Sequence, residues 1–306
     1  MSVTVFGSIN IDVTAYAERI PAIGETLHGT AYKTGLGGKG ANQAVAAARL
    51  GVPTAFVGRV GGDGFADEAA RQIAGYGVDA GLLLRDRDAA TGIAVIGVDA
   101  EGRNVIWVIA GANGRLDATD VERAQPQLAR SKVLLLQIEV PLESSLAAAA
   151  VTRAAGGLVV LDPAPVPPSG VADQVYTAVD ILTPNEVETG MLLGTTPRTA
   201  DDALSSARAL RARGARTAIV KMGALGAAYS GPEGEAFVPA FKVQAVDTVA
   251  AGDCFNGGLA AGLAQGLSLA EAMRMASATG ALATTRQGSA EAAPTLAEVR
   301  KLLGGS

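Results

Sequence analysis

Short apolar runs rich in β-branched residues recur along the chain, and each is followed by polar or turn-forming residues. The runs read VTVFG, TAFVGRV, VLLLQIE, LVVLDPAP, DILTPNE and TAIVKMG. Between most of them lie alanine-rich stretches of helical length, such as GANQAVAAARLG, GFADEAARQIAGYG, PLESSLAAAAVTRAAG and TADDALSSARALRARG. Strands that alternate with helices are typical of a mostly parallel sheet with helices on both faces. The pattern therefore predicts an α/β protein with three layers.

Two segments interrupt this alternation. Residues 13–34 are rich in turn residues and include PAIGET, and residues 91–109 contain two alternating runs around DAEG. The second segment is typical of a β-hairpin. Both are too short to be domains and would leave the core near the same edge, so we expect them to form a small β-sheet lid. Residues 1–12, 35–90 and 110–306 would form the core of a single domain over residues 1–306.

Composition narrows the class of partner. The chain has 306 residues, of which 49% are hydrophobic, so it can bury a large core. With a net charge of −5, the chain lacks the excess of basic residues that is typical of nucleic-acid binders, so a small-molecule partner is expected. Cys254 is the single cysteine, which excludes an intrachain disulfide and a cysteine-built zinc site. Without a leader or a membrane-spanning apolar run, we expect a cytoplasmic protein.

Polar residues follow most of the predicted strands. In an open α/β sheet, ligands bind outside the carboxyl ends of the strands, so these residues are candidates for a site. Each one alone could equally be a helix cap or a loop residue. The candidates are Asn10, Asp12, Glu139, Asp162, Asn185, Glu188, Lys221 and Gly223.

A glycine-rich turn, GLGGKGANQA, leads into a predicted helix at residues 35–44. It lacks the GxxxxGK[ST] spacing of a P-loop. Its letters GLGGKG match GxGxxG, but they follow the predicted lid segment and not a strand of the alternating core, so they do not form a dinucleotide fingerprint. The turn offers backbone N–H groups together with Lys39 and Asn42, a set of donors suited to sugar hydroxyls. A plain turn with a helix cap is the alternative.

A second glycine-rich helix start lies in VDTVAAGDCFNGG, residues 246–258. The backbone N–H groups of Ala251, Gly252 and Asp253 could converge with the positive end of the helix on a negative oxygen. The Asp253 carboxylate is either the N-cap of this helix or a base. Phosphoryl transfer to an alcohol needs both a base for the hydroxyl proton and donors for the transferring group. The residues alone do not decide whether Asp253 is a helix cap or a base.

Other chemistry finds little support. His28 is the single histidine, and no GxSxG nucleophile elbow accompanies it, so acyl transfer by a histidine triad is not indicated. Cys254 is expected to be a small packing residue, since no basic partner for a thiolate can be placed. Trp107 lies in the predicted hairpin, where lid packing or an interface contact is expected.

Seven motifs resemble those of the ribokinase-type sugar kinases, in the same order and spacing. They read GSINIDV, PAIGET, GGKGANQAVAAARLG, AGAN, PLES, TPNEVE and VQAVDTVAAGDCFNGG, and the resemblance extends over residues 3–294. It implies a large α/β/α domain with a small β-sheet lid through which the chain would form a homodimer. It also implies transfer of a phosphoryl group from ATP to the terminal 5-hydroxyl of a sugar, with D-ribose as the expected acceptor.

The resemblance also implies a role for particular residues. Asp253 would be the base, and the amides of residues 251–253 would form the anion hole. The sugar would be bound by Asn10, Asp12, Gly38, Lys39, Asn42, Glu139 and Asp253. The nucleotide would lie along Asn185, Lys221, Gly223, Gly226, Gly252 and Ser277. Glu188 would organise Mg²⁺ through water. An activating K⁺ would be held by Asp247 and by the carbonyl oxygens of Val249, Ala283, Arg286 and Gly288.

Some positions depart from the pattern of the family. The motif GAGD is here AAGD, in which an alanine can still expose its N–H if its φ stays negative, so the change does not count against activity. Lys221 stands where a small hydroxyl residue is common, and it could reach a phosphate or point to solvent. Ser277 and Ala292 replace polar side chains that are frequent at the adenine and cation sites.

Three alternatives remain. A kinase of the same fold could act on deoxyribose, a ketohexose or a nucleoside, although a buried Asn10 amide facing a missing hydroxyl would cost roughly 1–3 kcal/mol. A sugar-binding protein without catalysis would have no need of Asp253 as a base. A dinucleotide-dependent oxidoreductase is disfavoured because the GLGGKG turn does not follow a predicted core strand, as a dinucleotide fingerprint would.

Overall fold

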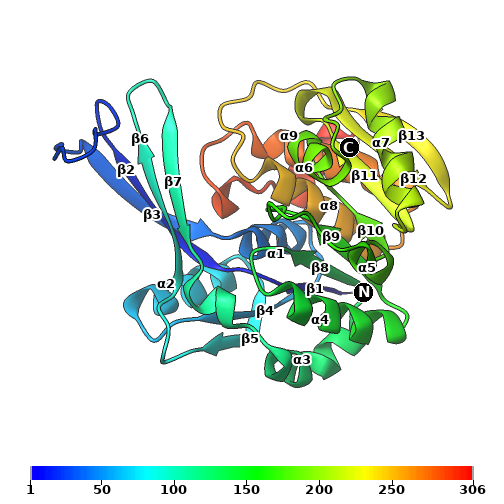
Figure 1. The fold of residues 1–306 in the computed structure, drawn as a ribbon, viewed down its shortest axis with the longest axis horizontal. Coiled ribbons are helices and arrows are strands. Elements are labelled where there is room, and N and C mark those ends of the chain that lie inside the picture. The colour runs from blue at the N-terminus through cyan, green and yellow to red at the C-terminus, as the bar shows by residue number, and fades with distance from the viewer. Residues whose placement is uncertain (1, 305–306) are drawn as a thin grey trace.

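A nine-stranded sheet forms the centre of the computed structural model, which describes residues 2–304 (Figure 1). Its strand order is β13-β12-β11-β10-β9-β8-β1-β4-β5. All neighbours from β11 to β5 are parallel, whereas β12 and β13 add an antiparallel hairpin at one edge. The strands are β1 (Val3–Phe6), β4 (Thr54–Val60), β5 (Asp79–Arg85), β8 (Val133–Gln137), β9 (Leu158–Asp162), β10 (Ile181–Leu182), β11 (Thr217–Lys221), β12 (Gly226–Gly231) and β13 (Gly234–Pro239).

Helices cover both faces of this sheet. Successive side chains of a strand point to opposite faces, so Val3 and Val5 of β1 belong to one buried cluster and Phe6 belongs to the other. The first cluster packs against α1 (Lys39–Arg49), α2 (Gly64–Gly75), α8 (Ala251–Ala264), α9 (Leu269–Ala283) and α10 (Leu296–Leu302). The second packs against α3 (Ala118–Arg130), α4 (Leu142–Ala154), α5 (Asp173–Ala178), α6 (Glu186–Leu193) and α7 (Ala200–Ala212). The predicted three-layer architecture is confirmed.

A smaller, four-stranded sheet projects from one side of the core (Figure 1). Its order is β3-β2-β6-β7, with β3 (Ala31–Gly37), β2 (Asn10–Tyr16), β6 (Gly92–Val98) and β7 (Asn104–Ile109). The hairpin predicted around DAEG joins β6 to β7, and the Asp99 carboxylate accepts the N–H groups of Glu101 and Arg103 in its turn. β2 leaves the core directly after β1, so the smaller sheet begins at Asn10, three residues before the predicted boundary of the lid.

The helices α1 and α8 approach each other very closely. A Cβ atom placed on Gly257 of α8 would lie 2.7 Å from the carbonyl oxygen of Gln43 in α1. Only glycine allows this contact without a shift of one helix, since real Cβ atoms do not approach a backbone oxygen so closely. The contact brings the first turns of α1 and α8 together at the carboxyl edge of the sheet.

None of the helices within residues 2–304 combines the length and the apolar character that crossing a membrane requires.

Candidate active site

Helix α8 begins with free backbone donors. Its N-cap is Ala250, which provides no side-chain hydrogen bond to the first turn. Within residues 2–304, the N–H groups of Gly252 and Asp253 have no backbone acceptor, whereas the N–H of Ala251 donates to the Thr248 carbonyl at 3.3 Å. Free N–H groups at the positive end of a helix suit an anion. Two of the three amides predicted to form the anion hole are therefore available without any rearrangement.

The alanine that replaces the first glycine of the GAGD motif adopts a left-handed backbone. Ala250 has a φ of 56°, and it is the one non-glycine among the described residues with a positive φ. The condition of a negative φ is met by the helical Ala251 but not by Ala250. A side chain in this conformation costs about 1–2 kcal/mol. The tight turn that opens α8 is therefore kept despite the loss of the glycine.

The carboxylate of Asp253 is held by α1 and does not cap its own helix. One oxygen, Oδ2, accepts Asn42 Nδ2 at 3.0 Å, and the other, Oδ1, accepts Gln43 Nε2 at 3.1 Å. The residue is 6% exposed. Burial raises the pKa of Asp253, and the charge of Lys39 and the two amide hydrogen bonds oppose this rise only in part. A fixed carboxylate with a raised pKa suits a general base.

A chain of buried polar groups continues from Asp253 to the next strands. Gln43 Nε2 also donates to Asp162 Oδ2 at 3.1 Å, and Gln137 Nε2 donates to Gln43 Oε1 at 2.7 Å. The other oxygen of Asp162, Oδ1, accepts Lys221 Nζ at 2.9 Å. Sequence reasoning listed Asp162 as a candidate at a strand end without a specific role, and it missed Gln43 and Gln137. Its one available signal for Gln43 was the neighbouring position of Asn42.

Lys39 lies among carboxylates at the start of α1. Burial lowers its pKa, but the negative charges around it outweigh this effect, so the pKa of Lys39 is raised above its ordinary value. Those charges belong to Asp253, Asp162, Glu139 and Glu188. The ammonium therefore keeps its charge and compensates several acids at once.

Asn10 is held in place by a second asparagine. Asn10 Oδ1 accepts Asn113 Nδ2 at 2.7 Å, and Asn113 Oδ1 accepts the N–H of Ile9 at 2.9 Å. Asn10 is buried, and its amide orientation is fixed by this contact because its oxygen must face the donor of Asn113. Sequence reasoning missed Asn113, although the residue belongs to the AGAN motif.

Asp12 faces the loop that follows α9. The Ser289 hydroxyl donates to Asp12 Oδ2 at 2.9 Å. Burial raises the pKa of Asp12 to about 6, an effect that the Ser289 hydrogen bond opposes and that the negative charges of Glu291, Glu139 and Asp253 increase. This carboxylate therefore changes its charge much closer to neutral pH than an ordinary aspartate does.

The glycine-rich turn closes this side of the site. Gly38 has a φ of 86°, and a Cβ placed on it would lie 3.0 Å from the backbone N of Asn10, so a side chain is excluded there. The N–H of Lys39 donates to Glu139 Oε2 at 3.0 Å, and Ser8 Oγ donates to the same oxygen at 2.6 Å. Asp12 and Lys39 each interact electrostatically with Asp253 and Glu139, and Gly38 packs against the backbone of Asn10.

A pocket of about 660 Å³ lies against the other side of the α8 N-terminus. Its lining includes all six residues predicted to contact the nucleotide, namely Asn185, Lys221, Gly223, Gly226, Gly252 and Ser277. The buried hydroxyl of Ser277 has no hydrogen-bond partner within residues 2–304. A buried polar atom without a partner favours a ligand group at that position.

Asn185 and Glu188 form a capping box at the start of α6. Asn185 Oδ1 accepts the N–H of Glu188 at 2.8 Å, and Glu188 Oε2 accepts the N–H of Asn185 at 2.8 Å. Burial raises the pKa of Glu188, and the charge of Lys221 opposes this rise. No group of three or more His, Cys, Asp or Glu side chains within residues 2–304 has the geometry of a metal site.

Asp247 connects the two loops behind the start of α8. Its Oδ1 accepts the N–H of Val249 at 3.0 Å, and its Oδ2 accepts the N–H of Gly288 at 3.2 Å. The carbonyl oxygens of Val249, Arg286 and Gly288 accept no backbone hydrogen bond from the described part of the chain, whereas that of Ala283 accepts the N–H of Arg286 at 3.4 Å. Most of the predicted cation ligands therefore have free acceptor capacity.

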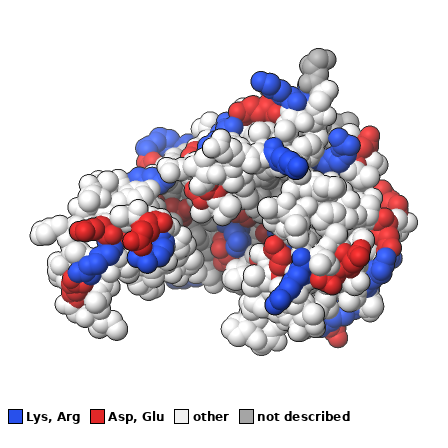
Figure 2. Space-filling view, turned by 90° about the horizontal axis from the view of Figure 1, so that it is seen from above, with Lys and Arg blue, Asp and Glu red and all other residues white. Residues whose placement is uncertain are grey.

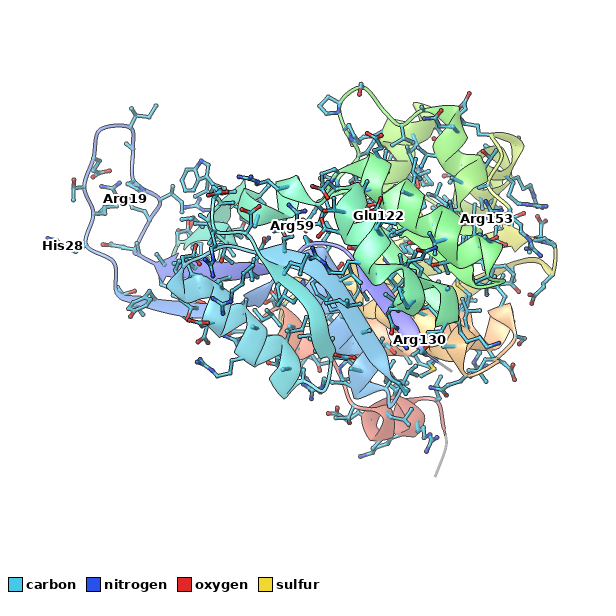
Figure 3. All side chains as sticks on the ribbon, turned by 90° about the horizontal axis from the view of Figure 1, so that it is seen from below. Arg19, His28, Arg59, Glu122, Arg130 and Arg153 are labelled. Atoms are coloured by element: carbon cyan, nitrogen blue, oxygen red, sulfur yellow. The ribbon has the colours of Figure 1, made fainter. Side chains whose placement is uncertain are left out.

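Two reactive residue types lie outside this chemistry. Figure 3 shows His28 on the loop at the outer end of the smaller sheet, away from the core, and the residue is exposed. Cys254 is 1% exposed, and burial raises the pKa of its thiol. Neither residue can act as a nucleophile or base at the start of α8.

Figure 2 shows a hollow between the smaller sheet and the core, with acidic and basic side chains at its floor.

Several known proteins are similar to this chain in sequence. Ribokinase of Haemophilus influenzae is 36% identical over 302 residues, which cover 99% of this chain and 98% of that protein. Deoxyribokinase of Salmonella typhi is also 36% identical, over 304 residues that cover 99% of each chain. Both similarities extend along the full length of this chain.

Solved structures of similar proteins superpose closely. Ribokinase from Thermotoga maritima has a TM-score of 0.89 and 33% sequence identity, covering 99% of each chain. Arabidopsis thaliana ribokinase complexed with ribose and ATP has a TM-score of 0.87 and 30% identity, also over 99% of each chain. The model of the pfkB family carbohydrate kinases matches residues 1–296, and the chain therefore belongs to that family.

Proposed function

We propose that this protein is a ribokinase, which transfers the γ-phosphoryl group of ATP to the 5-hydroxyl of D-ribose and releases ADP. The observation that carries the proposal is the start of α8, where the fixed carboxylate of Asp253 lies beside the free N–H groups of Gly252 and Asp253. A base and an anion hole at one point are what phosphoryl transfer to an alcohol requires. The relatives named ribokinase, and the complex of one with ribose and ATP, support this assignment.

Sugar binding and stabilisation of the phosphoryl group would be performed by different groups of the site. The sugar would be held, with its primary alcohol facing Asp253, by Asn10, Asp12, Gly38, Lys39, Asn42 and Glu139. The carboxylate would accept the proton of this hydroxyl as the oxygen attacks the γ-phosphorus. The amides at the start of α8 would stabilise the negative charge on the transferring group, in a space from which water is excluded.

Magnesium fits the nucleotide side of the site. Mg²⁺ is commonly bound through one or two carboxylates, phosphate oxygens and water, so the absence of a carboxylate cluster in residues 2–304 does not conflict with it. Glu188 would hold the ion through water, because its oxygens already accept hydrogen bonds from Asn185. The ion would neutralise charge on the phosphates.

Potassium fits the loops behind the anion hole. Asp247 joins these loops, and the carbonyls of Val249, Arg286 and Gly288 have free acceptor capacity. We infer that an activating monovalent cation binds there together with the carbonyl of Ala283. It would fix the turn of Ala250, whose left-handed backbone has no glycine to favour it.

The smaller sheet would act as a lid on a single kinase domain over residues 1–306, and its closure would protect ATP from hydrolysis. β7 exposes a row of apolar side chains, including Trp107 at 59%. Exposed apolar patches of this kind mark interaction surfaces, so we infer a homodimer in which the lids pack together. A single buried cysteine and the use of ATP favour a cytoplasmic enzyme.

A kinase for deoxyribose is the second candidate, because deoxyribokinases of Salmonella are as similar in sequence as ribokinases are. A screen of ADP release across ribose, deoxyribose, fructose, adenosine and pseudouridine separates the two. We expect ribose to give the highest kcat/KM. A clear preference for deoxyribose would establish the second candidate, and no ADP release with any sugar would overturn both.

Replacing the base tests its role. Asp253→Asn should lower kcat on the order of 10²–10⁴-fold while the affinities for ribose and ATP stay within about tenfold, because the proton acceptor is lost but the binding groups remain. Steady-state kinetics and calorimetry measure both effects. Asp67→Asn, at an exposed carboxylate of α2, is the matched control and should behave as the wild type. Near-normal turnover of Asp253→Asn would exclude the residue as the base.

The raised pKa of Asp12 predicts how ribose binding depends on pH. The ionised carboxylate accepts hydrogen bonds from sugar hydroxyls, and with a pKa of about 6 it gains a proton as the pH falls through that value. Ribose affinity should therefore be full above about pH 7 and decline towards about pH 5. Calorimetric titration over this range should show the decline in the wild type and a smaller one in Asp12→Asn. Equal slopes for both proteins would argue against this role of Asp12.

The cation proposal predicts a dependence on the salt used. Activity in K⁺ should exceed activity in Na⁺ or Li⁺ at the same ionic strength, because the smaller ions fit a cage of carbonyl oxygens less well. K⁺ should also raise the melting temperature of the wild type more than that of Asp247→Asn, since an ion that binds only the folded state stabilises it. Indifference of both readouts to the cation would contradict the assignment.

A further inference from the structure

The side chain of Lys221 points into the site. The residue ends β11, where its backbone N–H donates to the Pro184 carbonyl at 2.8 Å. Its side chain is 11% exposed, and Nζ donates to Asp162 Oδ1 at 2.9 Å. Of the two orientations that the sequence leaves open for this lysine, the one towards solvent is therefore excluded.

The ammonium group of Lys221 lies beside the anion hole. A Cβ placed on Gly252 would be 3.5 Å from Nζ, and both residues line the same 660 Å³ pocket. The N–H of Gly252 is free, so an anion bound there would meet two donors that come from different elements, β11 and α8. Donors that converge in this way from a strand end and a helix start define one position for a negative oxygen.

The ion pair between Lys221 and Asp162 is not expected to add much to the stability of the fold. A buried ion pair stabilises a protein little more than apolar side chains of the same size would, because both charges lose their hydration. The second oxygen of Asp162 accepts Gln43 Nε2, and the same nitrogen donates to Asp253. One hydrogen-bonded chain thus connects Lys221 with the base. This connection fixes the lysine relative to the carboxylate that receives the hydroxyl proton.

We propose that Lys221 is a catalytic residue whose ammonium binds the transferring phosphoryl group, and that Asp162 is the positioning residue that holds this ammonium at the anion hole. The inference rests on the proposed kinase function and adds to it a charged donor at the place where a small hydroxyl residue is common in the family. A charged donor is worth most where negative charge develops in a space shielded from water.

The lysine keeps its proton throughout the transfer of the phosphoryl group to the sugar hydroxyl. The hydroxyl proton of the sugar passes to the Asp253 carboxylate, and the hydroxyl oxygen forms a bond to the γ-phosphorus. The bond from this phosphorus to the bridging oxygen breaks, and its electron pair remains on the β-phosphate of ADP. Lys221 gives up no proton, and its ammonium stays close to the oxygens of the phosphoryl group during the transfer.

Two variants separate a catalytic lysine from a structural one. Lys221→Met keeps the length of the side chain and removes the charge, which leaves Asp162 buried without its partner and should lower the melting temperature. In the double variant Lys221→Met/Asp162→Asn, that carboxylate is neutral, so the melting temperature should recover. We expect kcat to fall at least about 100-fold in both variants. Lys301→Met, at an exposed lysine of α10, is the matched control and should match the wild type.

Binding measurements distinguish this inference from the kinase assignment itself. Affinity for ADP alone should change less than about threefold in Lys221→Met, while affinity for ADP with aluminium fluoride and ribose should fall in proportion to kcat. Affinity for the non-hydrolysable analogue AMP-PNP should also fall more than affinity for ADP, and this comparison needs no sugar. Recovery of kcat together with stability in the double variant would overturn the inference. A wild type that binds both nucleotides but phosphorylates no sugar would overturn the kinase assignment instead.

Discussion

The buried carboxylate of Asp253 is the constraint on which the rest of the site depends. A charged group at this depth is costly unless hydrogen bonds hold it, and the amides of Asn42 and Gln43 supply them. Both amides come from α1, so they reach the carboxylate only because α1 and α8 pack closely at Gly257. The helix contact, the proposed base and the proposed anion hole are thus parts of one arrangement at the carboxyl edge of the sheet.

Charge balance explains the polar residues around this carboxylate. Lys39 compensates several acids at the start of α1, and Lys221 pairs with Asp162 beside the pocket proposed for the nucleotide. Without the charge of Lys39, burial and the negative charge of Asp162 would raise the pKa of Asp253 further and favour a proton on it, which would disable the proposed base. Such a concentration of ionised groups costs stability, and this cost is understandable where the groups act on a substrate.

The sequence was sufficient for the fold and for the local motifs. Alternating apolar strands and alanine-rich helices predicted the three layers, and the turn around DAEG predicted the hairpin that joins β6 to β7. The contacts of Gln43, Gln137 and Asn113 could not be predicted, because they join segments far apart in the chain and depend on helix packing. The left-handed backbone of Ala250 was missed for a related reason, since tertiary contacts override the local preference of alanine. Lys221 remained open until its partner Asp162 was placed beside it.

The central claim is that one hydroxyl, the primary alcohol of ribose, reaches Asp253 beside the anion hole. The most direct test is ³¹P and ¹³C NMR of the product formed from ATP and ¹³C-labelled D-ribose. Our account predicts that the phosphate is attached to carbon 5 alone, with one ADP formed per sugar phosphate. A phosphate on any other carbon, or ADP and inorganic phosphate without a sugar phosphate, would contradict it.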